Sequence, residues 1–86
     1  MSNAEKLSYR ILRKRPVPND ITPSEFLTWL NTDGWTTRQG KGSHLRIEKI
    51  FPDGFKWSYT VKIGGEKQIK PCYIRDIRNV VEEHEK

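Results

Sequence analysis

The fold is decided by residues 34–47, which read Gly34-Trp35-Thr36-Thr37-Arg38-Gln39-Gly40-Lys41-Gly42-Ser43-His44-Leu45-Arg46-Ile47. The pattern predicts a strand, a tight glycine turn and a second strand that begins at His44. Glycine adopts positive φ without steric cost and lets the backbone approach a ligand closely. Arg38, Lys41 and Arg46 bring positive charge to the same turn, beside a side chain of the type that transfers protons near neutral pH. Cations next to a proton-transferring group are what phosphodiester cleavage requires.

The residues before this stretch predict a helix over residues 23–32. Thr22-Pro23-Ser24-Glu25 matches a capping box, with proline at the first helical position. Phe26 and Leu30 lie on one apolar face, and Gly34 follows the last turn as a stop signal.

Three antiparallel strands are expected next, over residues 35–39, 44–50 and 55–63. The third alternates perfectly, and its apolar face consists of Phe55, Trp57, Tyr59, Val61 and Ile63. In the second strand, Leu45 and Ile47 share one face, so His44 and Arg46 lie on the other. The histidine is therefore expected to point away from the core.

A second helix begins at Pro71, where apolar residues recur at helical spacing. The predicted order is thus α-β-β-β-α, an α+β fold with both helices on one face of a three-stranded antiparallel sheet and the other face free. The expected core consists of Phe26, Leu30, Leu45, Ile47, Trp57, Tyr59, Val61, Ile74, Ile77 and Val81.

Residues 1–21 are predicted to form a basic N-terminal arm ahead of a domain at residues 22–86. Leu7, Tyr9 and Ile11 alternate with polar residues, a weak indication of a short strand over residues 6–11, with an edge strand or a disordered arm as alternatives. Prolines after Arg15 indicate an extended linker over residues 12–21.

Composition limits the class of protein. The 86 residues make one small domain with a net charge of +5, and residues 38–78 hold ten Lys and Arg against four Asp and Glu. That distribution indicates a polyanionic partner such as nucleic acid, although a merely basic surface would give the same composition. No apolar run is long enough for a membrane span. The single Cys72 and the two distant histidines, His44 and His84, give no disulfide and no metal-ligand spacing. We therefore expect a soluble, cytoplasmic domain without metal or cofactor.

Several of these residues carry a family resemblance. Gly34-Trp35, Arg38-Gln39 and Gly42-Ser43-His44 resemble the signature of HicA-type toxins, the mRNA interferases of bacterial type II toxin–antitoxin pairs. The segment from Ile69 to Ile77 resembles the C-terminal part of that family. The resemblance implies a fold like that of double-stranded RNA-binding domains, metal-independent endoribonuclease activity on mRNA, and inhibition by a HicB-type antitoxin. It also implies that His44 is the catalytic histidine. Residues 1–21 have no counterpart in the family pattern, and the hairpin over residues 50–63 is longer than usual.

The residue chemistry is consistent with that function. RNA is cleaved without metal when a base removes the 2′-hydroxyl proton and cations stabilise the phosphate. His44 is the candidate base, with a general-acid role as the alternative. The candidate phosphate-binding groups are Arg38, Lys41 and Arg46, with main-chain amides around Gly42 and Ser43.

Two other interpretations stay open at the level of sequence. The chain could be a non-catalytic RNA-binding module of the same fold, in which His44 only contacts RNA, or an inactive relative kept for protein contacts. Trp57 and Tyr59 could stack on bases, but their alternation with polar residues favours core packing. Cys72 lacks a second group to activate it as a nucleophile.

Overall fold

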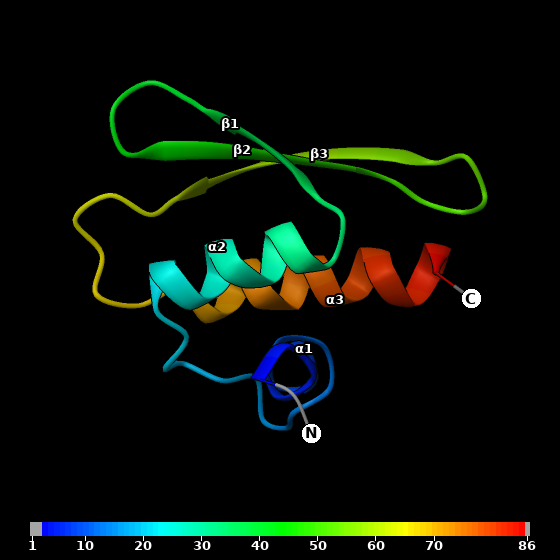
Figure 1. Ribbon diagram of the computed structural model, residues 1–86, viewed down its shortest axis with the longest axis horizontal. Helices are drawn as coiled ribbons and strands as arrows, with labels where there is room; N and C mark the ends of the chain where they lie inside the picture. Colours follow the sequence, from blue (N-terminus) through cyan, green and yellow to red (C-terminus); the bar gives the residue numbers. More distant parts are fainter. Residues whose placement is uncertain (1–2, 86) are drawn as a thin grey trace.

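The computed structural model of the protein describes residues 3–85. Six elements follow in the order α1 (Asn3–Leu12), α2 (Pro23–Thr32), β1 (Thr36–Gln39), β2 (His44–Ile50), β3 (Lys56–Lys62) and α3 (Pro71–His84). They form a small α+β domain in three layers (Figure 1): the sheet, then α2 and α3 against one of its faces, then α1 beneath these two helices. Within residues 3–85, no element covers the opposite face of the sheet.

Helix α2 begins and ends where the sequence predicts. The Glu25 amide donates to Thr22 Oγ1, and the Thr22 amide donates to Glu25 Oε1, each at 3.1 Å, so both halves of the capping box are present. The hydrogen bond from the Thr22 amide lowers the pKa of the Glu25 carboxyl, as does its pairing with Arg10. Gly34 follows with φ +83°, a conformation that few other residues adopt.

The sheet has the order β1-β2-β3, with both neighbouring pairs antiparallel. The strands match the prediction, except that β1 is one residue shorter at its start and β3 is one residue shorter at each end. Arg46 lies opposite Arg38 on β1 and Thr60 on β3, and His44 lies opposite Lys62. Because directly opposed residues share a face, these five side chains belong to the outer, uncovered face.

The core is larger than predicted and partly different. Seven of the ten predicted residues are buried, but Trp57, Tyr59 and Val81 are only half-buried at its rim. Trp57 and Tyr59 lie on β3, an edge strand with a neighbouring strand on one side only, which leaves the other flank of these side chains open. The buried apolar residues outside the expected core are Leu7, Ile11, Ile21, Trp29, Trp35, Phe51, Ile69 and Val80.

The predicted strand over residues 6–11 is wrong, because this segment is the helix α1. Leu7 and Ile11, four residues apart, both face the core, whereas Tyr9 points outward and is 55% exposed. The buried Arg78 of α3 binds the C-terminal end of α1, donating from Nε to the Ile11 carbonyl at 2.6 Å and from Nη2 to the Arg10 carbonyl at 2.9 Å.

The segment after α1 has no regular secondary structure, as predicted for the linker over residues 12–21, but it packs against the domain. Ile21 is fully buried, and its carbonyl accepts a hydrogen bond of 2.7 Å from the Ile69 amide. Residues 5–21 are therefore part of the packed domain and not a free arm; residues 1 and 2, where the predicted arm starts, and residue 86 lie outside the described part.

Candidate nucleic-acid interface

The turn between β1 and β2 is built around glycine. Gly42 has φ +62°, and the Gly40 amide donates to the His44 carbonyl at 2.9 Å to close the hairpin. A Cβ on Gly40 would lie 3.1 Å from that carbonyl oxygen, so the close approach favours glycine. The turn thus ends at His44, which is the first residue of β2.

His44 is exposed, and its ring is held by the main chain. Its Nδ1 lies 3.1 Å from the Lys41 carbonyl oxygen. Because a carbonyl oxygen only accepts, this contact is a hydrogen bond when Nδ1 carries the proton. That tautomer leaves Nε2 with a free lone pair, and no side or main chain within residues 3–85 hydrogen-bonds to it. The ring is therefore oriented as a proton acceptor.

The backbone of the same turn offers unused donors. Within the described residues, the amides of Lys41, Gly42 and Ser43 donate to no protein acceptor. The Ser43 carbonyl, by contrast, accepts from both the Ile63 and Gly64 amides at 3.0 Å, which fixes the turn against the end of β3. Successive free amides in a turn can bind an anion.

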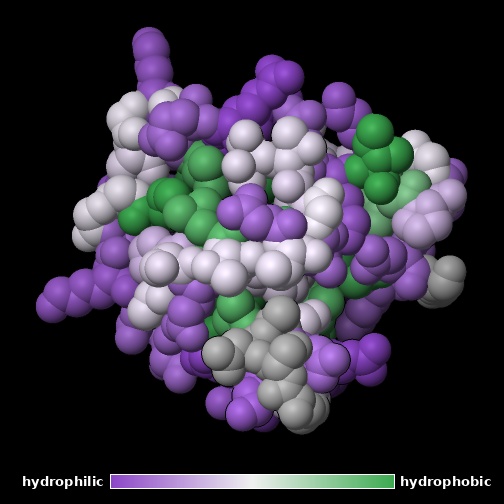
Figure 2. Space-filling model, in the orientation of Figure 1, coloured by the Kyte–Doolittle hydropathy of each residue, from purple (hydrophilic) through white to green (hydrophobic). Residues whose placement is uncertain are grey.

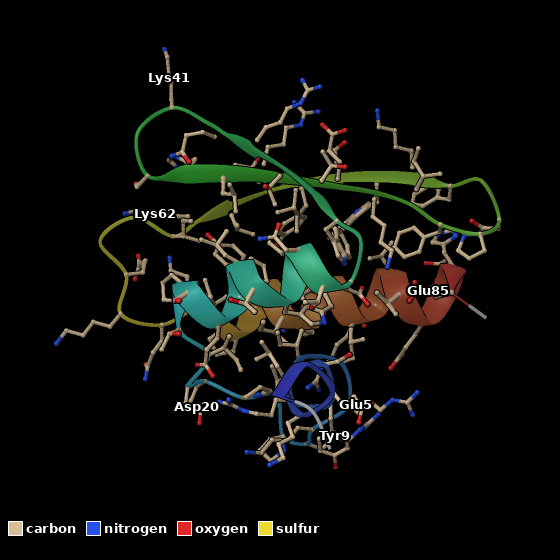
Figure 3. All side chains as sticks on the ribbon, viewed as in Figure 1. Glu5, Tyr9, Asp20, Lys41, Lys62 and Glu85 are labelled. Atoms are coloured by element: carbon tan, nitrogen blue, oxygen red, sulfur yellow. The ribbon has the colours of Figure 1, made fainter. Side chains whose placement is uncertain are left out.

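Cations surround His44 on the outer face. In the part of the chain that the structure describes, Arg38, Lys41 and Lys62 form no ion pair. Arg46 does, with Nε 3.3 Å from Glu48, but it stays half-exposed. Figure 3 shows Lys41 projecting from the turn away from the helices and Lys62 at the same end of the sheet, and Figure 2 shows the hydrophilic side chains along that edge. Unpaired cations around His44 favour the binding of a polyanionic ligand.

The structure therefore brings together all six residues predicted from the sequence, and it adds Lys62. The register places Lys62 directly opposite His44. Sequence reasoning missed it because its facing partner depends on the length and register of the β2–β3 hairpin. The alternation within β3 did place it on the outer face.

Other candidate groups lie elsewhere. Lys49 is a basic residue of β2, but its Nζ binds Asp33 Oδ2 at 2.9 Å and Glu85 Oε1 at 2.8 Å, so it joins elements of the domain. His84 stacks on Phe55 at the opposite end of β3. Cys72 is exposed. Among residues 3–85, no three His, Cys, Asp or Glu side chains gather as a metal site would require.

Comparisons with known proteins do not place the chain in a family. No protein-family model, no curated protein and no solved structure matches it. The resemblance to HicA-type toxins, and with it the likeness to double-stranded RNA-binding domains, stays a prediction from the motifs. None of the helices within residues 3–85 has both the length and the apolar character to span a bilayer.

Proposed function

We propose that this protein is a metal-independent endoribonuclease that cleaves mRNA, as the toxin of a type II toxin–antitoxin pair. One observation carries the proposal: the exposed His44 ring is held through Nδ1 by the Lys41 carbonyl, in the middle of unpaired cations and free turn amides. The element order α2-β1-β2-β3-α3 is the order that the sequence pattern predicts for the proposed catalytic domain.

RNA binding is assigned to the outer face of the sheet. Arg38, Lys41, Arg46 and Lys62 supply charges that are free or weakly paired, and the uncovered face leaves room for an extended polymer. Phosphate contacts of this kind provide most of the affinity and make it fall with salt concentration. Trp57 and Tyr59 face the helices, so they pack within the protein and do not stack on bases.

His44 is assigned the proton transfer. Its Nε2 accepts the proton of a ribose 2′-hydroxyl, the 2′-oxygen attacks the neighbouring phosphorus, and the bond from phosphorus to the 5′-oxygen breaks. The leaving 5′-oxygen takes a proton from water or from the imidazolium just formed. The products are a 2′,3′-cyclic phosphate and a 5′-hydroxyl. The turn amides and Lys41 stabilise the negative charge that develops on the phosphate oxygens.

A protein that binds the same surface would block this activity. We propose a HicB-type antitoxin that places acidic side chains over His44, Arg38 and Lys41. Electrostatic complementarity would make its association fast and sensitive to salt. An interface confined to α1 would contradict this assignment.

A non-catalytic RNA-binding module is the second candidate, and one observation favours it. Within residues 3–85, the His44 ring hydrogen-bonds only to a main-chain carbonyl, and no carboxylate pairs with it. In that case the turn would bind phosphate and His44 would serve only as a further contact.

The substrate itself distinguishes the two candidates. The test uses a synthetic RNA and the same sequence with 2′-deoxyribose throughout, both with EDTA present. We expect cleavage of the RNA to ends that carry a cyclic phosphate, and binding without cleavage of the deoxy strand. Cleavage of both strands, or loss of RNA cleavage when EDTA is added, would contradict the mechanism. Binding of RNA without cleavage would favour the second candidate.

A further inference from the structure

A groove lies on the side of the molecule away from the sheet. It has a volume of about 650 Å³ and runs between the C-terminal end of α1 with the segment that follows it, and the exposed side of α3. The charged and aromatic residues of its lining are Tyr9, Arg13, Arg15, Arg75, Arg78 and Glu82. Small-molecule sites in proteins have volumes of this order.

The groove has an excess of positive charge. Four arginines line it against the one carboxylate of Glu82. Within residues 3–85, Arg13 and Arg15 form no ion pair, and Arg75 reaches only Asp76, at 4.0 Å. Burial first, and the charge of Arg15 second, lower the pKa of Arg78, while the negative charge of Glu82 acts in the opposite direction.

Arg78 is held rigidly at the base of the groove. Arg78 is 8% exposed, and its Nε and Nη2 both donate hydrogen bonds to carbonyls at the end of α1. Its Nη1 has no acceptor in the described part of the chain. A guanidinium fixed in this way presents a donor in a set direction, and planar guanidinium groups match the oxygens of phosphate.

Most of the remaining lining is apolar. Leu12 and Val17 contribute aliphatic surface, and Tyr9 is a large side chain left more than half exposed. Figure 3 shows Tyr9 at the end of the molecule opposite to Lys41. A polar base with arginines and an aromatic ring at its edge suits a ligand with an anionic group and a flat or apolar part.

We propose that this groove binds a small phosphorylated ligand, with the phosphate among Arg13, Arg15, Arg75 and Arg78. The ligand can be free phosphate or a mononucleotide, whose base would then contact Tyr9. The site is separate from the β1–β2 turn, since the layer of α2 and α3 lies between them. The proposal is therefore independent of the ribonuclease activity.

Calorimetric titration of the full chain with AMP, inorganic phosphate and adenosine tests it. We expect AMP and phosphate to bind and adenosine not to bind; tighter binding of AMP than of phosphate would identify a nucleotide, and equal binding would identify phosphate alone. Absence of binding by both AMP and phosphate would overturn the proposal.

Variants then locate the site. Arg15→Ala with Arg75→Ala removes two exposed groove cations, and AMP affinity should fall by at least about tenfold. Lys67→Ala with Lys70→Ala is the matched control, since it removes two exposed cations that do not line the groove, and it should leave AMP affinity unchanged. An unchanged AMP affinity in the double variant would overturn the proposal. A third result would also overturn the proposal: AMP binds neither protein, and an RNA oligonucleotide binds the double variant more weakly than the wild type. The groove would then be a contact surface for RNA.

Discussion

Gly64→Ala should slow RNA cleavage strongly without replacing any side chain of the candidate interface. A Cβ at Gly64 would lie 2.2 Å from Ser43 Cβ and 2.8 Å from Ser43 Cα. Ordinary contacts of this kind begin at 3.4 Å, so Ser43 must move by about 1 Å. The Ser43 carbonyl accepts two main-chain hydrogen bonds at this point, and His44 is the next residue.

The magnitude follows from those contacts. Two weakened hydrogen bonds cost about 1 kcal/mol each in free energy of unfolding. A misplacement of about 1 Å at a reacting group lowers a rate by about a hundredfold. We therefore expect urea denaturation to show a loss of about 2 kcal/mol, and a cleavage assay at a temperature where the variant is folded to show about a hundredfold slower cutting of RNA.

The neighbouring Gly65 supplies the control. Its φ is +76°, but a Cβ there meets nothing within 4 Å. Gly65→Ala should cost about 1–2 kcal/mol through backbone strain while leaving Ser43 and the cleavage rate in place. Wild-type cleavage by Gly64→Ala, or an equal loss of cleavage in both variants, would refute the argument that the β3 end positions His44.

Three further predictions concern stability and binding. Trp29→Ala should cost about 3–5 kcal/mol in urea denaturation, and Trp57→Ala clearly less, because Trp29 is fully buried and Trp57 is only half-buried. The hydrogen bond from the Thr22 amide lowers the pKa of Glu25 below its ordinary 4.5. The ionised Glu25 carboxylate therefore stabilises the fold fully above about pH 4.5, and this stabilisation is lost as the pH falls through the lowered pKa. Glu25→Gln should flatten this part of the pH–stability curve measured by thermal denaturation. Lys41→Ala should weaken RNA binding and lower the slope of log affinity against log salt by about one phosphate contact in fluorescence anisotropy titrations.

The local elements were predictable because their causes are local. The capping box at Thr22 fixes the start of α2, and strict alternation fixes β3 and the faces of β2. These patterns also place His44 on the uncovered face, as the structure confirms. The candidate interface follows from them, except for Lys62, whose position opposite His44 depends on hairpin register.

The parts that could not be predicted depend on distant contacts. The segment around Leu7 and Ile11 is too short for its periodicity to separate a helix from a strand, and Arg78, more than sixty residues later, binds the end of α1. The groove of arginines exists only because α1 packs against α3. The partial exposure of Trp57 depends on which strand forms the sheet edge.

The central claim is that His44 transfers the proton while other groups hold the RNA. His44→Ala leaves Lys41, Arg38 and the turn amides in place, and the side chain is exposed, so the variant should fold. The most direct measurement is RNA cleavage with EDTA, followed alongside RNA affinity, for wild type and His44→Ala. The account predicts that cleavage is abolished and that affinity stays within about threefold, since phosphate contacts provide most of it. Cleavage by His44→Ala at the wild-type rate would contradict the account.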